Sequence, residues 1–347
     1  MESQYRGRNK TITGIDLFKL ISSILVVILH TTGPNSTPEQ IFFKRNICNI
    51  AVPFFFIASG YFFGKGLRKK NRKEYFILYE KRVIKLYIIW SAIGLPFAIH
   101  MYYTIYGKNW GYILLLLLRN IFFVGTFGIY WYILSLVCTM PLIYFFDKKN
   151  KLKLMYIFSF IFFMLGVIYY GFSSIYSQNI FLNSIAKLVH FIFSSERNFL
   201  MTGWFYISIG YYLSNKKIKM NLLLAFLFFI ISTILKISEQ YLVNINLFNF
   251  NIIFKSNELF IFQCLQALFL FIIALKIKVP WLDKYSKVMR ELSTTIYYTH
   301  FLFIDMIDAT LQNNTIYNTL ILLFMCSLFY IILKKINNKK LNILINA

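Results

Sequence analysis

Long apolar blocks, separated by short basic clusters, restrict the fold of this sequence more than any other feature. Ten blocks occur, at residues 12–32, 47–63, 83–105, 129–146, 154–171, 199–213, 220–237, 258–275, 293–311 and 316–333. Each approaches the roughly 20 residues with which a helix crosses a hydrocarbon core of about 30 Å. Only 14% of the 347 residues are charged, against about 25% in an average soluble domain. The sequence therefore predicts an all-α integral membrane protein, with about ten transmembrane helices in a single domain over residues 1–347.

The basic clusters predict which side of the membrane each loop faces. Most of the Lys and Arg residues lie near the N-terminus, in KGLRKKNRK (65–73), DKKNKLK (147–153), SNKKIK (214–219), residues 276–290 and KKINNKK (334–340). Lys and Arg accumulate in cytoplasmic loops, so ten spans put both termini in the cytoplasm. This asymmetry accounts for the net charge of +24. Because no zinc-finger spacing or RNA-binding motif accompanies the charge, we expect no nucleic-acid partner.

The segment 110–125 is apolar enough to span, but Arg119 lies in its middle. Counting it as a span would invert every later loop and remove the charge asymmetry, so a re-entrant or interfacial helix is favoured. The four cysteines are scattered singly through apolar blocks without a CxxC pair. We interpret them as small core residues rather than disulfides or metal ligands.

Three ionisable side chains lie inside the first apolar block, where charge is costly unless it faces a polar interior. Asp16, Lys19 and His30 fall on one side of a helix together with Ser23, because a helix advances about 100° per residue. Along the axis, Lys19 and His30 are about 16 Å apart. The stripe predicts a polar path through the bundle. The alternative is a local Asp16–Lys19 pair at the interface, with His30 reaching the outer headgroups.

The spacing Lys19-x10-His30 resembles the first-helix signature of the acyltransferase 3 family of membrane proteins. Further stretches resemble that family in the same order: VPFFFIASGYFF (52–63), YEKRVIKLYIIW (79–90), IYWYILSL (129–136), SSERNFLMTGWFYISIG (194–210) and LSTTIYYTHFLF (292–303). The resemblance covers most of the chain. Lys19 stands where most members have Arg, and Lys lacks the planar fork with which Arg holds a phosphate.

The resemblance implies acetyl-CoA, or another acyl-CoA, as a cytoplasmic co-substrate, with no bound cofactor and no metal ion. The acceptor it implies is a hydroxyl of an envelope polysaccharide or lipid-linked glycan. Expected catalytic residues are His30, as general base or nucleophile, and His300. Among the expected donor-binding residues, Lys19, Arg82 and Lys85 suit the phosphates of coenzyme A, and the hydroxyls of Ser59 and Tyr61 suit the thioester oxygen. Asp16, on the same stripe of the first helix, completes this set. Expected acceptor-binding residues are Trp131, Tyr132, Arg197 and Asn198.

Most of these residues keep a structural alternative. Ser59 and Tyr61 also suit helix packing, and Trp131 and Tyr132 also suit an aromatic belt. Arg197 and Asn198 also suit an anchor to headgroups. His300 also suits a buried histidine bonded to a backbone carbonyl. His100 and His190 are interpreted as structural.

Three functions follow from these patterns. The first is an O-acetyltransferase in the plasma membrane, in contact with the lipid bilayer; the Lys-, Asn- and Ile-rich composition suggests a low-GC bacterium. The second is a transporter of a small solute such as an amino acid, like the membrane domains fused to serine racemases. The third is a non-catalytic scaffold for glycan assembly. The sequence leaves open whether the chain forms a homo-oligomer.

Overall fold

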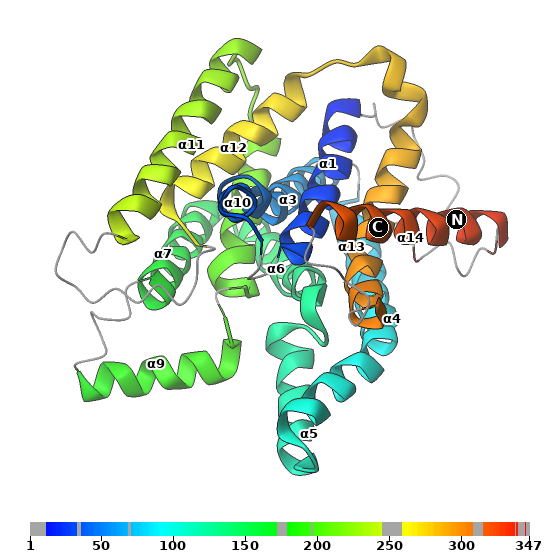
Figure 1. Ribbon diagram of the computed structural model, residues 1–347. Coiled ribbons are helices and arrows are strands. Elements are labelled where there is room, and N and C mark those ends of the chain that lie inside the picture. Colours follow the sequence, from blue (N-terminus) through cyan, green and yellow to red (C-terminus); the bar gives the residue numbers. More distant parts are fainter. Residues whose placement is uncertain are drawn as a thin grey trace.

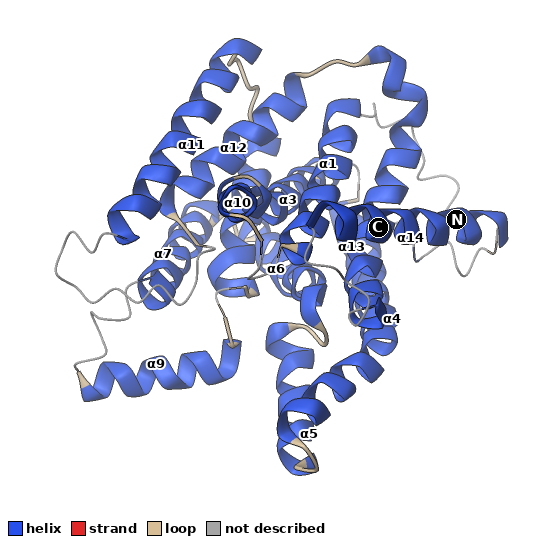
Figure 2. Ribbon diagram, viewed as in Figure 1, coloured by secondary structure: helices blue, strands red, loops and turns tan. Residues whose placement is uncertain are grey.

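The computed structural model describes residues 12–32, 36–68, 71–171, 179–195, 197–244, 259–307, 315–336, 338 and 344. Every regular element in these ranges is helical (Figure 2). The α-helices are α1 (Thr13–Thr31), α2 (Pro38–Asn46), α3 (Ala51–Leu67), α4 (Arg72–Tyr106), α5 (Trp110–Arg119), α6 (Trp131–Lys148), α7 (Leu152–Gly171), α9 (Ile180–Phe193), α10 (Trp204–Ser214), α11 (Leu222–Asn244), α12 (Ile261–Lys276), α13 (Ser286–Ile307) and α14 (Thr315–Ile336). Short turns are the 3-10 segments η1 (Cys48–Ile50), η3 (Gly128–Tyr130) and η5 (Pro280–Tyr285) and the π-helical segments η2 (Asn120–Val124) and η4 (Phe199–Gly203).

Helices occupy all ten predicted blocks, but the structure does not confirm ten spans. Among the described residues, seven helices are long and apolar enough to cross a membrane, or up to eight if a bent pair counts as one. That pair is α12 and the helix beginning at Pro280, with a bend of 100° between them. The block at 199–213 divides into η4 and an α10 of only 11 residues. Residues 1–11 and 345–347 lie outside the described residues, and the cytoplasmic termini stay a prediction.

The segment at 110–125 forms the ten-residue α5, followed by η2. At 1.5 Å per residue α5 is about 15 Å long, half the thickness of a hydrocarbon core. By length and composition it passes together with α6 as one candidate span, Trp110–Lys148. Arg119, at its end, donates hydrogen bonds to the Asn120 side chain and, at 3.1 Å, to the Phe191 carbonyl of α9. Arg119 therefore ties α5 to α9; Figure 1 shows α9 at the lower left and α5 at the bottom.

At the centre of the described helices, α3 packs against α10, α1, α12 and α6 (Figure 1). The contact of α3 with α10 uses a glycine on each helix. A Cβ on Gly60 would lie 2.0 Å from the Ile207 carbonyl oxygen, and a Cβ on Gly210 would lie 1.9 Å from the Ile57 carbonyl oxygen. The two backbones therefore touch directly, as membrane helices do where small residues meet. This contact fixes the position of α10 in the bundle.

Helix α1 runs beside α13, and Asp16 links their N-terminal ends. The loop charges predict that these ends face the cytoplasm. Asp16 is only 2% exposed. Its carboxylate accepts a hydrogen bond from the Ser286 hydroxyl and lies 3.8 Å from the Arg290 Nε. Asp16 thus pairs between helices, and it also acts electrostatically on Lys19 of its own helix. The α1–α13 pairing also brings His30 and His300 together at the opposite end.

Candidate active site

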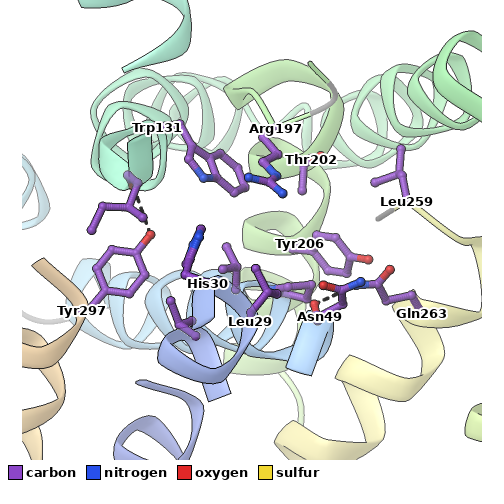
Figure 3. Close-up of a pocket in the computed structure, with 14 residues that line it drawn as sticks. Leu29, His30, Asn49, Trp131, Arg197, Thr202, Tyr206, Leu259, Gln263 and Tyr297 are labelled. Atoms are coloured by element: carbon purple, nitrogen blue, oxygen red, sulfur yellow. Dashed lines mark hydrogen bonds between the residues drawn. The ribbon is translucent and has the colours of Figure 1, made fainter. Parts of the chain in front are cut away.

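A pocket that is partly open to solvent lies at the C-terminal end of α1. Three of the predicted site residues line it: His30 from α1, Trp131 from α6 and Arg197 just before η4. In Figure 3 the His30 ring points into this space, with Trp131 and Arg197 above it. The sequence thus located three side chains of one pocket from segments more than 60 residues apart.

His300 of α13 lies beside His30. The ring centroids are 5.3 Å apart, and the His300 side chain is fully buried. His300 Nδ1 lies 2.9 Å from the Ile296 carbonyl oxygen, which can only accept, so Nδ1 carries the hydrogen. In the neutral ring, Nε2 then keeps a lone pair, and it has no hydrogen-bond partner among the described residues. The backbone-bonded alternative therefore describes only one nitrogen of His300, and the other remains available for chemistry.

Asn198 holds the turn that carries Arg197. Its Oδ1 accepts hydrogen bonds from the Leu200 and Met201 amides at 3.0 and 2.8 Å, and its Nδ2 donates to the Ser195 carbonyl at 2.9 Å. These contacts cap the π-helical turn η4, a type of turn often found at functional sites. Asn198 is 1% exposed and does not line the pocket. We therefore expect Asn198 to position Arg197 rather than to touch an acceptor.

Trp131 is placed by a close approach of the chain. Gly125 has a φ of +96°, in the left-handed region that favours glycine. A Cβ there would lie 2.3 Å from the Trp131 amide nitrogen. The turn before α6 consequently requires glycine at 125, and the indole of Trp131 enters the pocket as a result.

Ser59, expected to bind the donor, and Tyr132, expected to bind the acceptor, lie in contact beside the pocket. The Ser59 hydroxyl lies 2.8 Å from the Tyr132 hydroxyl, and the Tyr132 ring packs on Tyr297 with centroids 5.2 Å apart. Neither Ser59 nor Tyr132 lines the pocket. Tyr61 packs its ring edge-on against Phe271, at 5.3 Å between centroids. The positions of Ser59 and Tyr61 fit their packing alternative, whereas Tyr132 is buried inside the bundle and not placed in an aromatic belt.

The predicted donor-binding cations lie toward the other end of α1. Lys19 is half-buried, with Nζ 5.0 Å from the Phe62 ring centroid. Arg82 and Arg290 are near enough to interact electrostatically with Lys19. The side chains of Arg82 and Lys85 are exposed. The sequence did not single out Arg290, because this residue lies in the basic cluster 276–290, which membrane orientation already accounts for. The structure brings three cations from α1, α4 and α13 to one place.

Five further polar or aromatic residues line the pocket: Asn49, Thr202, Tyr206, Gln263 and Tyr297. The sequence patterns described above do not single out these residues. Thr202, Tyr206 and Tyr297 lie inside stretches that carry the family resemblance, but tyrosine and threonine are ordinary in membrane helices. The amides of Asn49 and Gln263 inside apolar blocks were a usable signal, because an amide at membrane depth needs hydrogen-bond partners. Gln263 Nε2 donates to the Asn49 carbonyl at 2.8 Å.

A fully buried lysine supports this wall of the pocket. Lys236 of α11 is 0% exposed, and its Nζ donates to the carbonyls of Arg45 and Asn46 at 2.9 and 3.4 Å. These carbonyls end α2, where the last turn of a helix leaves acceptors unsatisfied and favours a cation. Gln266 Nε2 also donates to the Asn46 carbonyl, at 3.0 Å. Lys236 thereby fixes α2 and the following turn η1, which carries Asn49.

Replacing Lys236 by methionine is expected to destabilise the protein. The change removes the charged donor shared by the Arg45 and Asn46 carbonyls, which then keep only the amide donors Asn49 Nδ2 at 3.4 Å and Gln266 Nε2 at 3.0 Å. A hydrogen bond to a charged group contributes about 1.5–3 kcal/mol. Thermal unfolding of the detergent-purified chain measures the effect as a lower midpoint. Lys219→Met, at an exposed lysine, is the matched control. A Lys236→Met midpoint equal to that of the control would show that these carbonyls do not depend on the ammonium.

A second cavity, of about 1070 Å³ with open solvent included, lies among the ends of α3, α4, α6, α7 and α10. Its cations have partners: Arg72 pairs with Asp147, Arg68 donates to the Ser214 hydroxyl at 2.5 Å, and Lys216 lies over the Tyr212 ring. None of its lining residues belongs to the pocket at His30.

The remaining candidates lie elsewhere. His100 and His190 are exposed and do not line the pocket. The four cysteines are free thiols, buried or half-buried. Within the described ranges, no three His, Cys, Asp or Glu side chains are grouped to hold a metal ion.

Fold and site together define a multi-pass membrane protein with a pair of histidines, suited to acid–base chemistry, at a pocket inside the helix bundle. The chain belongs to the acyltransferase 3 family, described as "Acyltransferase domain", which it matches over residues 12–337. This confirms the resemblance seen in the sequence over nearly the whole chain.

Relatives include two proteins from Enterococcus faecalis named "Amino-acid racemase". They are 25% and 27% identical over 60% and 62% of this chain, which covers 29% and 31% of their lengths. A "Serine/alanine racemase" from Enterococcus gallinarum is 32% identical over 25% of this chain and 13% of its own length. This chain thus spans under a third of the curated relatives it matches. No solved structure matches it.

Proposed function

We propose that the chain is a membrane-bound O-acetyltransferase that moves an acetyl group from cytoplasmic acetyl-CoA to a hydroxyl of an extracytoplasmic envelope carbohydrate. The observation that carries the proposal is the His30–His300 pair at a pocket, in a chain that belongs to an acyltransferase family. Acyl transfer to a hydroxyl needs a base close to the attacking oxygen, and histidine is the side chain that most often serves.

In the proposed reaction, His30 takes the proton of the acceptor hydroxyl while the oxygen attacks the thioester carbon. The C–S bond then breaks, and the imidazolium returns the proton to the coenzyme A sulfur. The products are the acetyl ester and free coenzyme A, and no proton is gained or lost. The two rings are not hydrogen-bonded to each other in the structure, and the His300 Nε2 lone pair has no partner among the described residues. In the proposed reaction this lone pair accepts the other N–H of His30 as the imidazolium forms, which orients the ring.

The donor is proposed to enter near the N-terminal end of α1, where Lys19 of that helix lies close to Arg82 of α4 and Arg290 of α13. These cations suit the phosphates of coenzyme A, and Lys85 adds a further charge on the same helix as Arg82. The slender pantetheine arm then follows α1 toward His30, a distance of about 16 Å along the helix.

The proposal is tested with inside-out membrane vesicles from cells that express the full chain, and with matched vesicles from cells that do not. Acetyl-CoA labelled on the acetyl group is supplied outside, with membranes of the native host as the acceptor source. We expect label in lipid-linked or polymeric carbohydrate only where the chain is present. Equal label in both preparations, with the chain correctly inserted, would contradict the proposal.

A second candidate function is uptake of a small solute, because the relatives above are named amino-acid and serine/alanine racemases. Under this alternative the pocket at His30 binds the solute, and no thioester is consumed. Accumulation of labelled serine or alanine by intact cells, dependent on the chain and without release of coenzyme A, would favour transport over acetyl transfer.

A further inference from the structure

The electrostatic character of the pocket indicates what kind of acceptor it takes. Arg197 lines the pocket and points into it above His30 (Figure 3). Lys44 and Arg197 both interact electrostatically with the His30 ring. In the described part of the chain, no lining residue is acidic. Two cations therefore act on the space in front of His30, and the described lining adds no acidic group to it.

Water screens these cations only weakly, because apolar groups form much of the wall. Val26, Leu29 and Pro53 line the pocket together with Trp131. In surroundings of low dielectric constant, water screens a fixed charge only weakly, so the cavity concentrates ions of the opposite sign. An anionic group is the ligand that such a cavity stabilises best.

The wall opposite His30 offers hydrogen bonds suited to hydroxyl groups. The hydroxyl of Tyr206 and the Oε1 of Gln263 are buried and have no hydrogen-bond partner among the described residues. The Gln263 amide cannot turn freely, because its Nε2 is held by the Asn49 carbonyl. Its Oε1 can only accept, and buried polar groups are rarely left unpaired, so a ligand hydroxyl is a matching donor for it. Figure 3 places Tyr206 and Gln263 together, across the pocket from His30.

We infer that the acceptor is an anionic polyol: a sugar or polyol unit with a phosphate or carboxylate group in addition to its hydroxyls. Its anionic group lies at Arg197, one hydroxyl donates to Gln263 Oε1 and another contacts Tyr206. The hydroxyl to be acetylated faces His30. This inference rests on the proposed acetyltransferase function, and it names the class of substrate for that site.

The test uses the detergent-purified full chain, to which both faces are open, with labelled acetyl-CoA and three acceptor probes of matched length. The probes are an oligomer of glycerol phosphate, an oligogalacturonate and a neutral maltooligosaccharide. We expect at least one anionic probe to be acetylated about 10–100-fold faster than the neutral one, the range for a hydrogen bond to a charged group. The comparison of the first two probes distinguishes phosphate from carboxylate.

Variants connect the preference to Arg197. Arg197→Gln is expected to lower the ratio of anionic to neutral kcat/KM by about tenfold or more, and Arg197→Lys by less, because it keeps the charge. Lys216→Gln, at a cation of the second cavity, should keep the wild-type ratio. Equal rates on anionic and neutral probes, or an unchanged ratio in Arg197→Gln, would overturn the inference.

Binding is measured separately, as thermal stabilisation of the chain by each probe without acetyl-CoA. Stabilisation by an anionic probe that is lost in Arg197→Gln, with no acetyl transfer, would overturn the proposed function and support the charge preference. Equal stabilisation by all three probes, or none by any, would overturn the inference on its own.

Discussion

Replacement of His30 by alanine is expected to lower acetyl transfer by about 10²–10⁴-fold, the usual contribution of a general base. The ring points into the pocket, and among the described residues no hydrogen bond commits either of its nitrogens. Alanine removes the base without adding volume to a packed helix. The measurement is the initial rate of label transfer from acetyl-CoA in vesicles, normalised to the amount of inserted protein.

Two further variants serve as the control and as a test of whether His30 and His300 act together. His190→Ala, at an exposed histidine of α9, should transfer at the wild-type rate. His300→Gln should lower kcat with little change in the KM of acetyl-CoA, and its effect should not add to that of His30→Ala, because both act through one ring. Wild-type transfer by His30→Ala would remove His30 from the chemistry.

Replacement of Gly210 by alanine is expected to disrupt the bundle. The added methyl group would lie 1.9 Å from the Ile57 carbonyl oxygen and 2.8 Å from the Tyr61 amide nitrogen, and backbone atoms cannot rotate away. Separation of α3 from α10 would loosen the most closely packed contact of the fold. Overpacking costs about 1–3 kcal/mol, and more where the backbone must shift. Thermal unfolding of the purified chain and its monodisperse fraction in detergent measure the loss.

Gly111→Ala is the control for this substitution. Gly111 lies in α5, and a Cβ there would meet nothing within 4 Å. It should therefore keep the wild-type midpoint or raise it slightly, since alanine favours helix over glycine. A Gly210→Ala midpoint equal to that of Gly111→Ala would show that α3 and α10 can separate without loss.

The sequence predicted where helices form better than how many of them span. Hydropathy reports apolar composition, and all ten predicted blocks contain helix. It does not report where a helix is interrupted. The block at 199–213 begins with a π-helical turn capped by Asn198, and the chain bends by 100° between α12 and the helix that begins at Pro280. Both interruptions depend on local hydrogen bonds and turns, which average hydropathy cannot register.

Some residues of the candidate site were predictable from the sequence and others were not. His30 was predictable, because an imidazole inside an apolar helix requires a reason, and periodicity placed it on the polar stripe. Tyr206 was not, because a tyrosine in an apolar block has the same pattern whether it faces lipid or a pocket. Asn198 was assigned to ligand binding, but its side chain is used by backbone contacts in the structure. Only the packed fold distinguishes a residue that binds from one that holds its neighbour.

The continuous course of α1 sets a fixed length scale for any donor. Lys19 and His30 belong to one unbroken helix, so no hinge between them can shorten their separation of about 16 Å. A compact acyl donor, whose reactive carbon lies next to its phosphate, could touch one end of that interval but never both. A donor that uses both must carry its anionic groups and its acyl carbon at opposite ends of a long, thin chain.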